Sequence, residues 1–119
     1  MNTPGYVLYH YPGCGTSRNV LALLREAGIE PEIILYREHP LDIAALRALR
    51  DQLGQSAYAL LRSKEALCAQ LGLDQPNLDD DTILHAIAAH PELFNRPILV
   101  SPRGTRVCRP SEEARALLP

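Results

Sequence analysis

The sequence predicts an α/β fold in which helices flank a mixed four-stranded sheet. Three observations lead to this class: a strand–helix–strand pattern near the start, a purely helical stretch in the middle, and two strands followed by a helix at the end. A strand–helix–strand unit implies a parallel pair of strands, whereas two strands joined by a short turn pair antiparallel. One sheet that contains both kinds of pairing is mixed.

The first of these patterns is a βαβ unit. Residues 6–10 alternate weakly and are rich in Tyr, which predicts a strand. A helix begins near Thr16 or Ser17, continues through apolar residues at helical spacing, and ends at Gly28. The run "EIILY", residues 32–36, is β-branched and predicts the second strand. The helix then crosses over right-handed between two parallel strands.

The middle of the chain predicts a helical insertion from about residue 41 to residue 90. Its helical segments are residues 41–54, residues 56–72 (one or two short helices) and residues 78–91. The first two end at glycines and the third at a proline, which are common helix terminators. Asp79–Asp81 supply a cap and first-turn acids to the third segment, and this acidic run reads as a solvated helix start.

The last part of the chain adds a hairpin and a helix. Residues 96–101 and 104–110 predict two strands joined by a short turn, and residues 111–118 predict a terminal helix capped by Ser111. The order β-α-β, helices, β-β-α on one sheet is a thioredoxin-like arrangement. The length of 119 residues predicts a single domain, residues 1–119.

Composition and charge exclude several classes of function. The net charge of −2 provides no general attraction to nucleic acid. No apolar run reaches the roughly 18 residues of a membrane span, and no signal-peptide pattern opens the chain, so we expect a cytoplasmic protein without a membrane partner. The three cysteines are odd in number and widely spaced, which indicates neither a disulfide framework nor a metal site.

Cys14 is the strongest candidate for a reactive group. It lies between the first strand and the first helix, flanked by Gly13 and Gly15, where helix N–H groups favour a thiolate. His10, at the end of the first strand, could add positive charge. The alternative is a small structural residue, but the position in this loop favours a nucleophile. Ser17 stands where a C-x-x-C motif would place a resolving cysteine, so Cys14 must act as a single nucleophile.

Three arginines, Arg62, Arg96 and Arg109, come from segments that could converge on this loop. Arginine suits planar, bidentate binding of oxyanions, although each one taken alone reads more readily as a solvated surface group. Arg96 differs because it precedes Pro97, which opens a strand at the place of the cis-proline in thioredoxin folds. The residue before that proline faces the nucleophile.

The remaining cysteines and histidines carry no predicted chemistry. Cys68 reads as a helical core or boundary residue, and Cys108, in the middle of a predicted strand, reads as a buried apolar thiol. The other histidines, whose spacing forms no metal site, are His39, His85 and His90.

Four segments together resemble the glutaredoxin-linked arsenate reductases. They are "YHYPGCGTSRN", "ALLRSKE", "HPELFNRPILV" and "GTRVCRPSE", which match that family in order and spacing. The resemblance runs from about Tyr6 to Pro119 and covers essentially the whole chain. It rests on the combination of the cysteine loop with the Asn-Arg-Pro and Cys-Arg-Pro motifs.

The resemblance implies an oxidoreductase that reduces arsenate to arsenite. Cys14 would attack arsenate to form a covalent adduct, and His10 would help to lower the cysteine pKa. Arg62, Arg96 and Arg109 would hold the oxyanion and stabilise the thiolate. Glutathione, as co-substrate, would attack the adduct, and glutaredoxin would remove it as a mixed disulfide. The scheme requires no metal and no bound cofactor.

Other functions of the same fold stay open at the level of sequence. Spx-type transcription regulators share the topology, but they typically carry a C-x-x-C switch, and Ser17 weighs against that reading. A monothiol glutaredoxin-type oxidoreductase would need a glutathione groove, but not three converging arginines. A catalytically silent relative is the third alternative.

Overall fold

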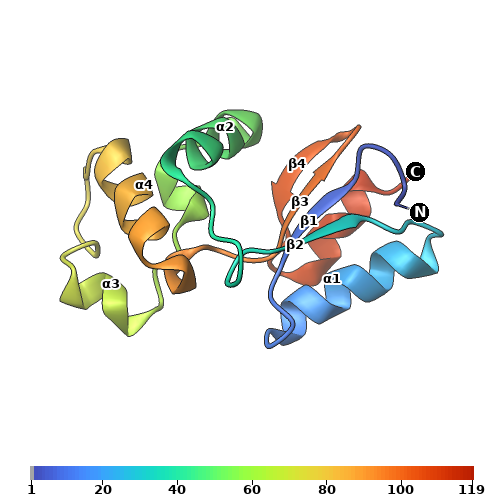
Figure 1. Cartoon of the computed structure of the whole chain (residues 1–119), viewed down its shortest axis with the longest axis horizontal. Helices are drawn as coiled ribbons and strands as arrows, with labels where there is room; N and C mark the ends of the chain where they lie inside the picture. Colours follow the sequence, from blue (N-terminus) through green and yellow to red (C-terminus); the bar gives the residue numbers. More distant parts are fainter. Residues whose placement is uncertain (1) are drawn as a thin grey trace. The chain divides into compact units, whose positions relative to one another are not determined.

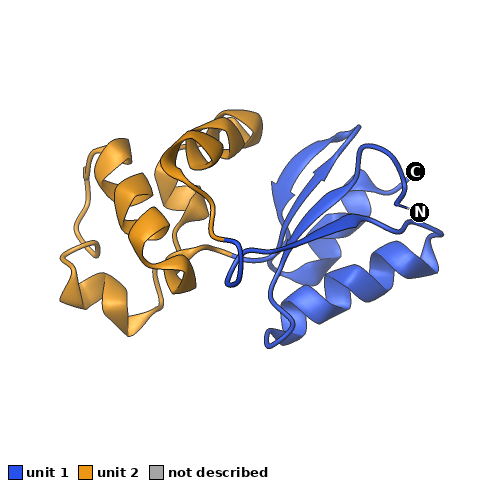
Figure 2. Cartoon of the chain, in the orientation of Figure 1, with its two compact units in different colours: residues 1–39, 96–119 blue, residues 40–95 orange. Residues whose placement is uncertain are grey.

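The computed structural model describes residues 2–119 (Figure 1). The chain forms two compact units: unit 1 comprises the residues up to 39 together with residues 96–119, and unit 2 comprises residues 40–95 (Figure 2). Unit 2 coincides closely with the helical insertion predicted for residues 41–90. The single domain over residues 1–119 stays a prediction. Within the described chain, no helix is long and apolar enough to cross a membrane.

Unit 1 contains the sheet. Its elements are β1 (Val7–His10), α1 (Gly15–Glu26), β2 (Glu32–Leu35), β3 (Ile98–Ser101), β4 (Gly104–Val107) and the 3₁₀-helix η3 (Ser111–Leu117). The strand order is β2-β1-β3-β4, with β1 parallel to β2 and β3 antiparallel to both of its neighbours. The predicted mixed four-stranded sheet and its thioredoxin-like arrangement are therefore confirmed.

The core of unit 1 lies between the sheet and the two helices α1 and η3 (Figure 1). Leu8 of β1 pairs with Leu99 of β3, and both side chains are fully buried there. The other buried residues of this cluster are Tyr6, Val20, Leu24, Ile29, Cys108, Ala114 and Leu117. Because side chains alternate along a strand, His10 lies on the same face as Leu8, toward α1.

Several predicted boundaries in unit 1 differ from the structure. Helix α1 begins at Gly15, whereas the predicted start was Thr16 or Ser17. Gly28, with φ +80, ends the helix as predicted. Strand β4 ends at Val107, so the prediction that it reaches residue 110 is wrong. The predicted Ser111 cap is also wrong: Pro110, extended at φ −66 and ψ 167, takes the N-cap position and accepts the first hydrogen bond of η3.

Unit 2 is helical, as predicted. Its elements are α2 (Ile43–Leu53), the 3₁₀-helix η1 (Ala57–Leu60), α3 (Ala66–Gln70), α4 (Asp80–Ala89) and the 3₁₀-helix η2 (Pro91–Leu93). Asp42 caps α2 by accepting a hydrogen bond from the Ala45 N–H, and Gly54 ends the helix in the left-handed region at φ +68. The buried core includes Leu46, Leu49, Leu60, Ile83, Leu84, Leu93 and Phe94.

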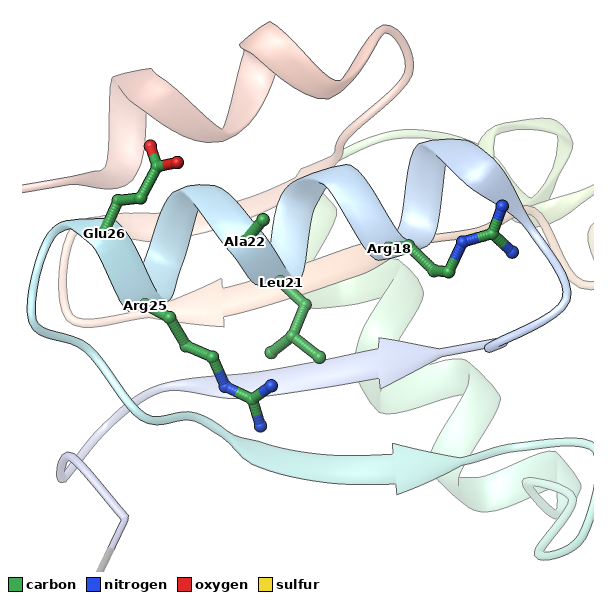
Figure 3. A pocket seen from close by; sticks show the side chains of 5 residues that line it. All are labelled: Arg18, Leu21, Ala22, Arg25 and Glu26. Atoms are coloured by element: carbon green, nitrogen blue, oxygen red, sulfur yellow. The ribbon is translucent and has the colours of Figure 1, made fainter.

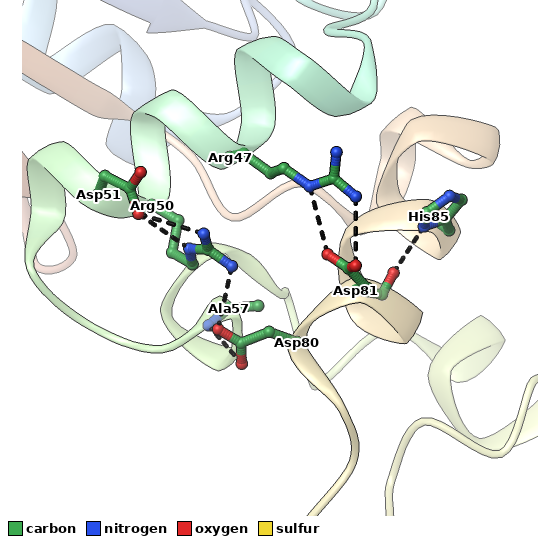
Figure 4. Close-up of polar contacts among 7 residues, drawn as sticks. All are labelled: Arg47, Arg50, Asp51, Ala57, Asp80, Asp81 and His85. Atoms are coloured by element: carbon green, nitrogen blue, oxygen red, sulfur yellow. Dashed lines mark hydrogen bonds and ion pairs between the residues drawn. The ribbon is translucent and has the colours of Figure 1, made fainter.

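The acidic start of α4 pairs with neighbouring elements, and the side-chain cap predicted there is not formed. Asp79 occupies the N-cap position, but its side chain makes no capping hydrogen bond. The carboxylate of Asp80 accepts hydrogen bonds from Arg50 and from the backbone of η1, and Asp81 pairs with Arg47 (Figure 4). These contacts join α4 to α2 and η1. The Arg47–Asp81 pair is exposed, and an exposed ion pair contributes only about 0–1 kcal/mol.

Candidate active site

The register of the sheet brings Arg96 and Arg109 together in unit 1. Beyond the paired ends of β3 and β4, the Cys108 N–H donates to the Pro97 carbonyl at 2.9 Å, which continues the hairpin. Arg109 Nη1 then donates to the Arg96 carbonyl at 3.0 Å. Strand β1 pairs with β3 directly beside this end of the hairpin, so the loop that follows β1 reaches both arginines.

Both arginines precede a cis peptide bond. The Arg96–Pro97 bond is cis, as its place at the start of a thioredoxin-like strand predicts. The Arg109–Pro110 bond is also cis, a feature that was not predicted from the sequence.

Cys14 is the N-cap residue of α1 and lies beside both cations. Its Sγ is 3.6 Å from Arg109 Nη1, and the Arg96 side chain also hydrogen-bonds to it. Partial burial raises the pKa of the thiol, but the backbone N–H of Ser17, the two arginines and the backbone N–H of Thr16 lower it more strongly. The net pKa is about 7. A thiol with this pKa is about half ionised at pH 7.

The other two thiols are buried and protonated. Cys108 is fully buried, as the sequence predicts, and Cys68, which is 1% exposed, is the core residue of the two positions predicted for it. Burial raises the pKa of Cys68, and burial with the nearby charge of Glu113 raises the pKa of Cys108 to about 12. All three cysteines lie in the described part of the chain, and among them Cys14 alone has a lowered pKa.

His10 is held as an uncharged residue. It is 5% exposed, and its Nδ1 lies 2.6 Å from the Oγ of Ser17, which also accepts the Tyr11 N–H at 3.1 Å. Burial, followed by the charges of Arg25 and Arg18, lowers the pKa of His10. At neutral pH the imidazole is therefore neutral, and the positive charge around the thiol comes from arginine. The contact of His10 with Ser17 instead fastens the first turn of α1 to the end of β1.

Arg62 lies in unit 2. Its Nε donates to Glu65 Oε1 at 3.0 Å, one turn further along the chain, and its backbone N–H donates to the Leu93 carbonyl. Its role at the oxyanion site stays a prediction, as does a catalytic role for His10.

An aromatic and cationic group that was not predicted from the sequence lies beside Cys14. The Cζ atoms of Arg37 and Arg96 lie 4.3 Å and 5.3 Å from the centre of the Tyr11 ring, and the Tyr36 ring is 6.3 Å away. Burial raises the pKa of Tyr36, and the charges of Arg96, Arg37 and Cys14 all act on its hydroxyl. The sequence did contain a signal for Arg37. This residue follows β2, which is parallel to β1, so the residues after the two strands lie at the same edge of the sheet.

The outer face of α1 carries an open depression of about 610 Å³, distinct from the cysteine site. Its lining side chains are Arg18, Leu21, Ala22, Arg25 and Glu26 (Figure 3). Neither Cys14 nor its arginine neighbours line it. Residues 2–119 contain no cluster of three His, Cys, Asp or Glu side chains that could hold a metal ion.

Known proteins resemble this chain over nearly all of its length. The ArsC family matches residues 9–117. An arsenate reductase of Rhizobium meliloti is 46% identical over 112 residues, which are 94% of this chain and 80% of that protein. An arsenate reductase of Escherichia coli is 49% identical over 105 residues, which are 88% of this chain and 74% of that protein.

A solved structure agrees with these relatives. The arsenate reductase from Vibrio cholerae superposes with a TM-score of 0.89 at 40% identity, covering 95% of this chain and 97% of that one. The fold, the near-complete family match and the level of identity all point the same way: the chain belongs to the ArsC family.

Proposed function

We propose that the protein reduces arsenate to arsenite, with Cys14 as the nucleophile. The observation that carries this proposal is a thiol with a pKa of about 7 at the start of α1, in contact with two arginine side chains. The names of the relatives support the same substrate, because the R. meliloti, E. coli and V. cholerae proteins are all described as arsenate reductases.

In the first step the Cys14 thiolate attacks arsenic. A sulfur–arsenic bond forms while one arsenic–oxygen bond breaks, and the departing oxygen takes up protons and leaves as water. Arsenic stays in the +5 state in this step. Arg96 is buried, and Arg109 is exposed but hydrogen-bonded to the Arg96 carbonyl, so we assign both guanidinium groups as ligands for the oxyanion. Guanidinium groups suit this task because their planar N–H fork matches two oxygens at once. Arg62 is proposed as the third ligand.

In the second step glutathione supplies the electrons. Its thiolate attacks the Cys14 sulfur, the electron pair of the sulfur–arsenic bond passes to arsenic, and arsenite leaves with arsenic in the +3 state. The product is a Cys14–glutathione disulfide, which the thiolate of glutaredoxin attacks at the glutathione sulfur to free Cys14. An external thiol is needed because Ser17 replaces a local resolving cysteine and the two other cysteines are buried.

The test is arsenate-dependent NADPH oxidation coupled through glutathione reductase, glutathione and glutaredoxin. We expect turnover in the wild type, none in Cys14→Ser, and near-normal turnover in Cys68→Ser, the matched control for loss of a thiol. Omitting glutaredoxin should reduce turnover strongly. Absence of arsenate turnover in folded protein whose Cys14 reacts with iodoacetamide contradicts the proposal. A glutathione mixed disulfide offered in place of arsenate then tests the monothiol oxidoreductase alternative.

A further inference from the structure

Tyr11 connects the loop that carries the nucleophile to Arg96. Its backbone carbonyl accepts the N–H of Cys14 at 3.0 Å, so Tyr11 and Cys14 close one turn. Its ring lies directly against the backbone of Gly13, where an added Cβ would fall 2.8 Å from the ring carbon Cζ. The absence of a side chain at residue 13 therefore lets the ring occupy this position.

The same ring is in contact with two guanidinium groups. The Cζ atom of Arg37 is 4.3 Å from the ring centre, and that of Arg96 is 5.3 Å away. Both distances are within the range of a cation–π attraction. Arg96 is only 7% exposed, and a cation at such a depth depends on favourable electrostatic contacts for its stability. The face of an aromatic ring supplies one without neutralising the charge, so the guanidinium stays available to an anion.

We propose that Tyr11 is a positioning residue whose ring holds the Arg96 guanidinium against the oxyanion site at Cys14. This inference rests on the proposed function, since it assigns Arg96 to the oxyanion. In this proposal the face of the ring, and not the hydroxyl, attracts the guanidinium. Arg37 is a second cation in contact with the same ring. Loss of the ring frees Arg96 from its place beside the sulfur, which weakens both thiolate stabilisation and anion binding.

The experiment compares Tyr11→Leu with Tyr11→Phe. The leucine removes the ring, whereas the phenylalanine keeps the ring face and removes only the hydroxyl. The pH midpoint of iodoacetamide alkylation reports the Cys14 pKa without arsenate, so it remains informative even if arsenate is not the substrate. We expect Tyr11→Leu to raise the midpoint and to lower kcat/KM for arsenate about fivefold, the loss of a cation–π contact of about 1 kcal/mol. Tyr11→Phe should match the wild type in both measurements.

A double-mutant cycle tests whether Tyr11 acts through Arg96. In an Arg96→Ala background, Tyr11→Leu should produce little further change in the alkylation midpoint, because the group that it positions is already gone. A full, additive effect in that background overturns the proposal. An unchanged midpoint in folded Tyr11→Leu, or equal effects of leucine and phenylalanine, also overturns it.

A second variant covers the case in which Tyr11→Leu fails to fold. Gly13→Ala displaces the ring without removing it, because the new Cβ would lie too close to Cζ and to the hydroxyl. Circular dichroism and thermal unfolding establish that the variant is folded. A raised alkylation midpoint in Gly13→Ala supports the proposal, and an unchanged midpoint contradicts it.

Discussion

Replacing Arg109 by glutamine measures how much of the activation of Cys14 comes from this cation. Unit charges separated by the 3.6 Å between Arg109 Nη1 and Cys14 Sγ attract by about 1 kcal/mol in water and about 5 kcal/mol at an effective dielectric constant near 20. Because Arg109 is exposed, the lower part of this range applies. A loss of about 1–2 kcal/mol corresponds to roughly one pKa unit. The pKa of Cys14 should therefore rise from about 7 toward about 8.

The assay is the full pH dependence of iodoacetamide alkylation, since the rate at a single pH is a weak test. At pH 7 a rise of one pKa unit lowers the thiolate fraction about fivefold. The more basic thiolate is intrinsically about threefold more nucleophilic, so the observed rate falls only about twofold. The midpoint of the profile, in contrast, moves by the whole unit, and the rate at high pH rises.

Arg106→Gln is the matched control. It removes the same charge from a neighbouring part of the hairpin, where Arg106 pairs with Glu113 at 3.3 Å and is not among the groups that shift the pKa of Cys14. Its midpoint should equal that of the wild type. An Arg109→Gln midpoint that stays at the wild-type value, or one that Arg106→Gln reproduces, would refute the reasoning. Salt provides a second check. At 1 M salt the Debye length is about 3 Å, so the attraction between the exposed guanidinium and the thiolate is screened and the wild-type midpoint should rise.

Three further predictions concern the thiols, His10 and the helix end in unit 2. Native protein at pH 7.5 should take up one alkyl group per chain, at Cys14, and three only after denaturation, because Cys68 and Cys108 are buried. Mass spectrometry counts the labels, and a second label on the native protein contradicts this prediction. The free energy of unfolding should fall as the pH drops below about 6.5, because the lowered pKa of His10 lets the unfolded chain bind a proton before the native state does. Urea unfolding of His10→Asn should show a flatter pH dependence, and an unchanged slope contradicts this. Gly54→Ala should lose about 1 kcal/mol of stability, because it forces a side chain into φ +68, whereas Gly15→Ala, with no positive φ, should not.

Local sequence signals predicted most of the fold. The β-branched run before Tyr36 predicts β2, and Gly28 marks the end of α1 because only glycine adopts a positive φ there without strain. These signals act within a few residues along the chain. The end of β4 and the capping residue of η3 were wrongly predicted because they depend on pairing partners and on the conformation at Pro110, which no short window reveals.

The role expected of His10 shows what local reasoning cannot supply. A histidine beside a cysteine loop suggests a nearby positive charge when only the sequence is considered. In the folded chain, burial between β1 and α1 removes the imidazole from water and lowers its pKa. Ser17, which in the sequence appears only as a missing cysteine, becomes its hydrogen-bond partner. Burial is a property of the packed structure, so the protonation state of His10 follows from packing.

The sequence alone is enough to single out Cys14 among the three cysteines as the proposed nucleophile. Cys14 and the helix N–H groups that act on it are contiguous, so the electrostatic effect of the helix start is present in residues 14–17 alone. The cations that complete the site, in contrast, come together only in the folded chain. Arg109 is 95 residues from Cys14 in the chain, and the antiparallel pairing of β1, β3 and β4 brings it within 3.6 Å of the sulfur. Tyr11 and Arg37 join the site for the same reason, since parallel pairing of β1 with β2 places their strand ends side by side.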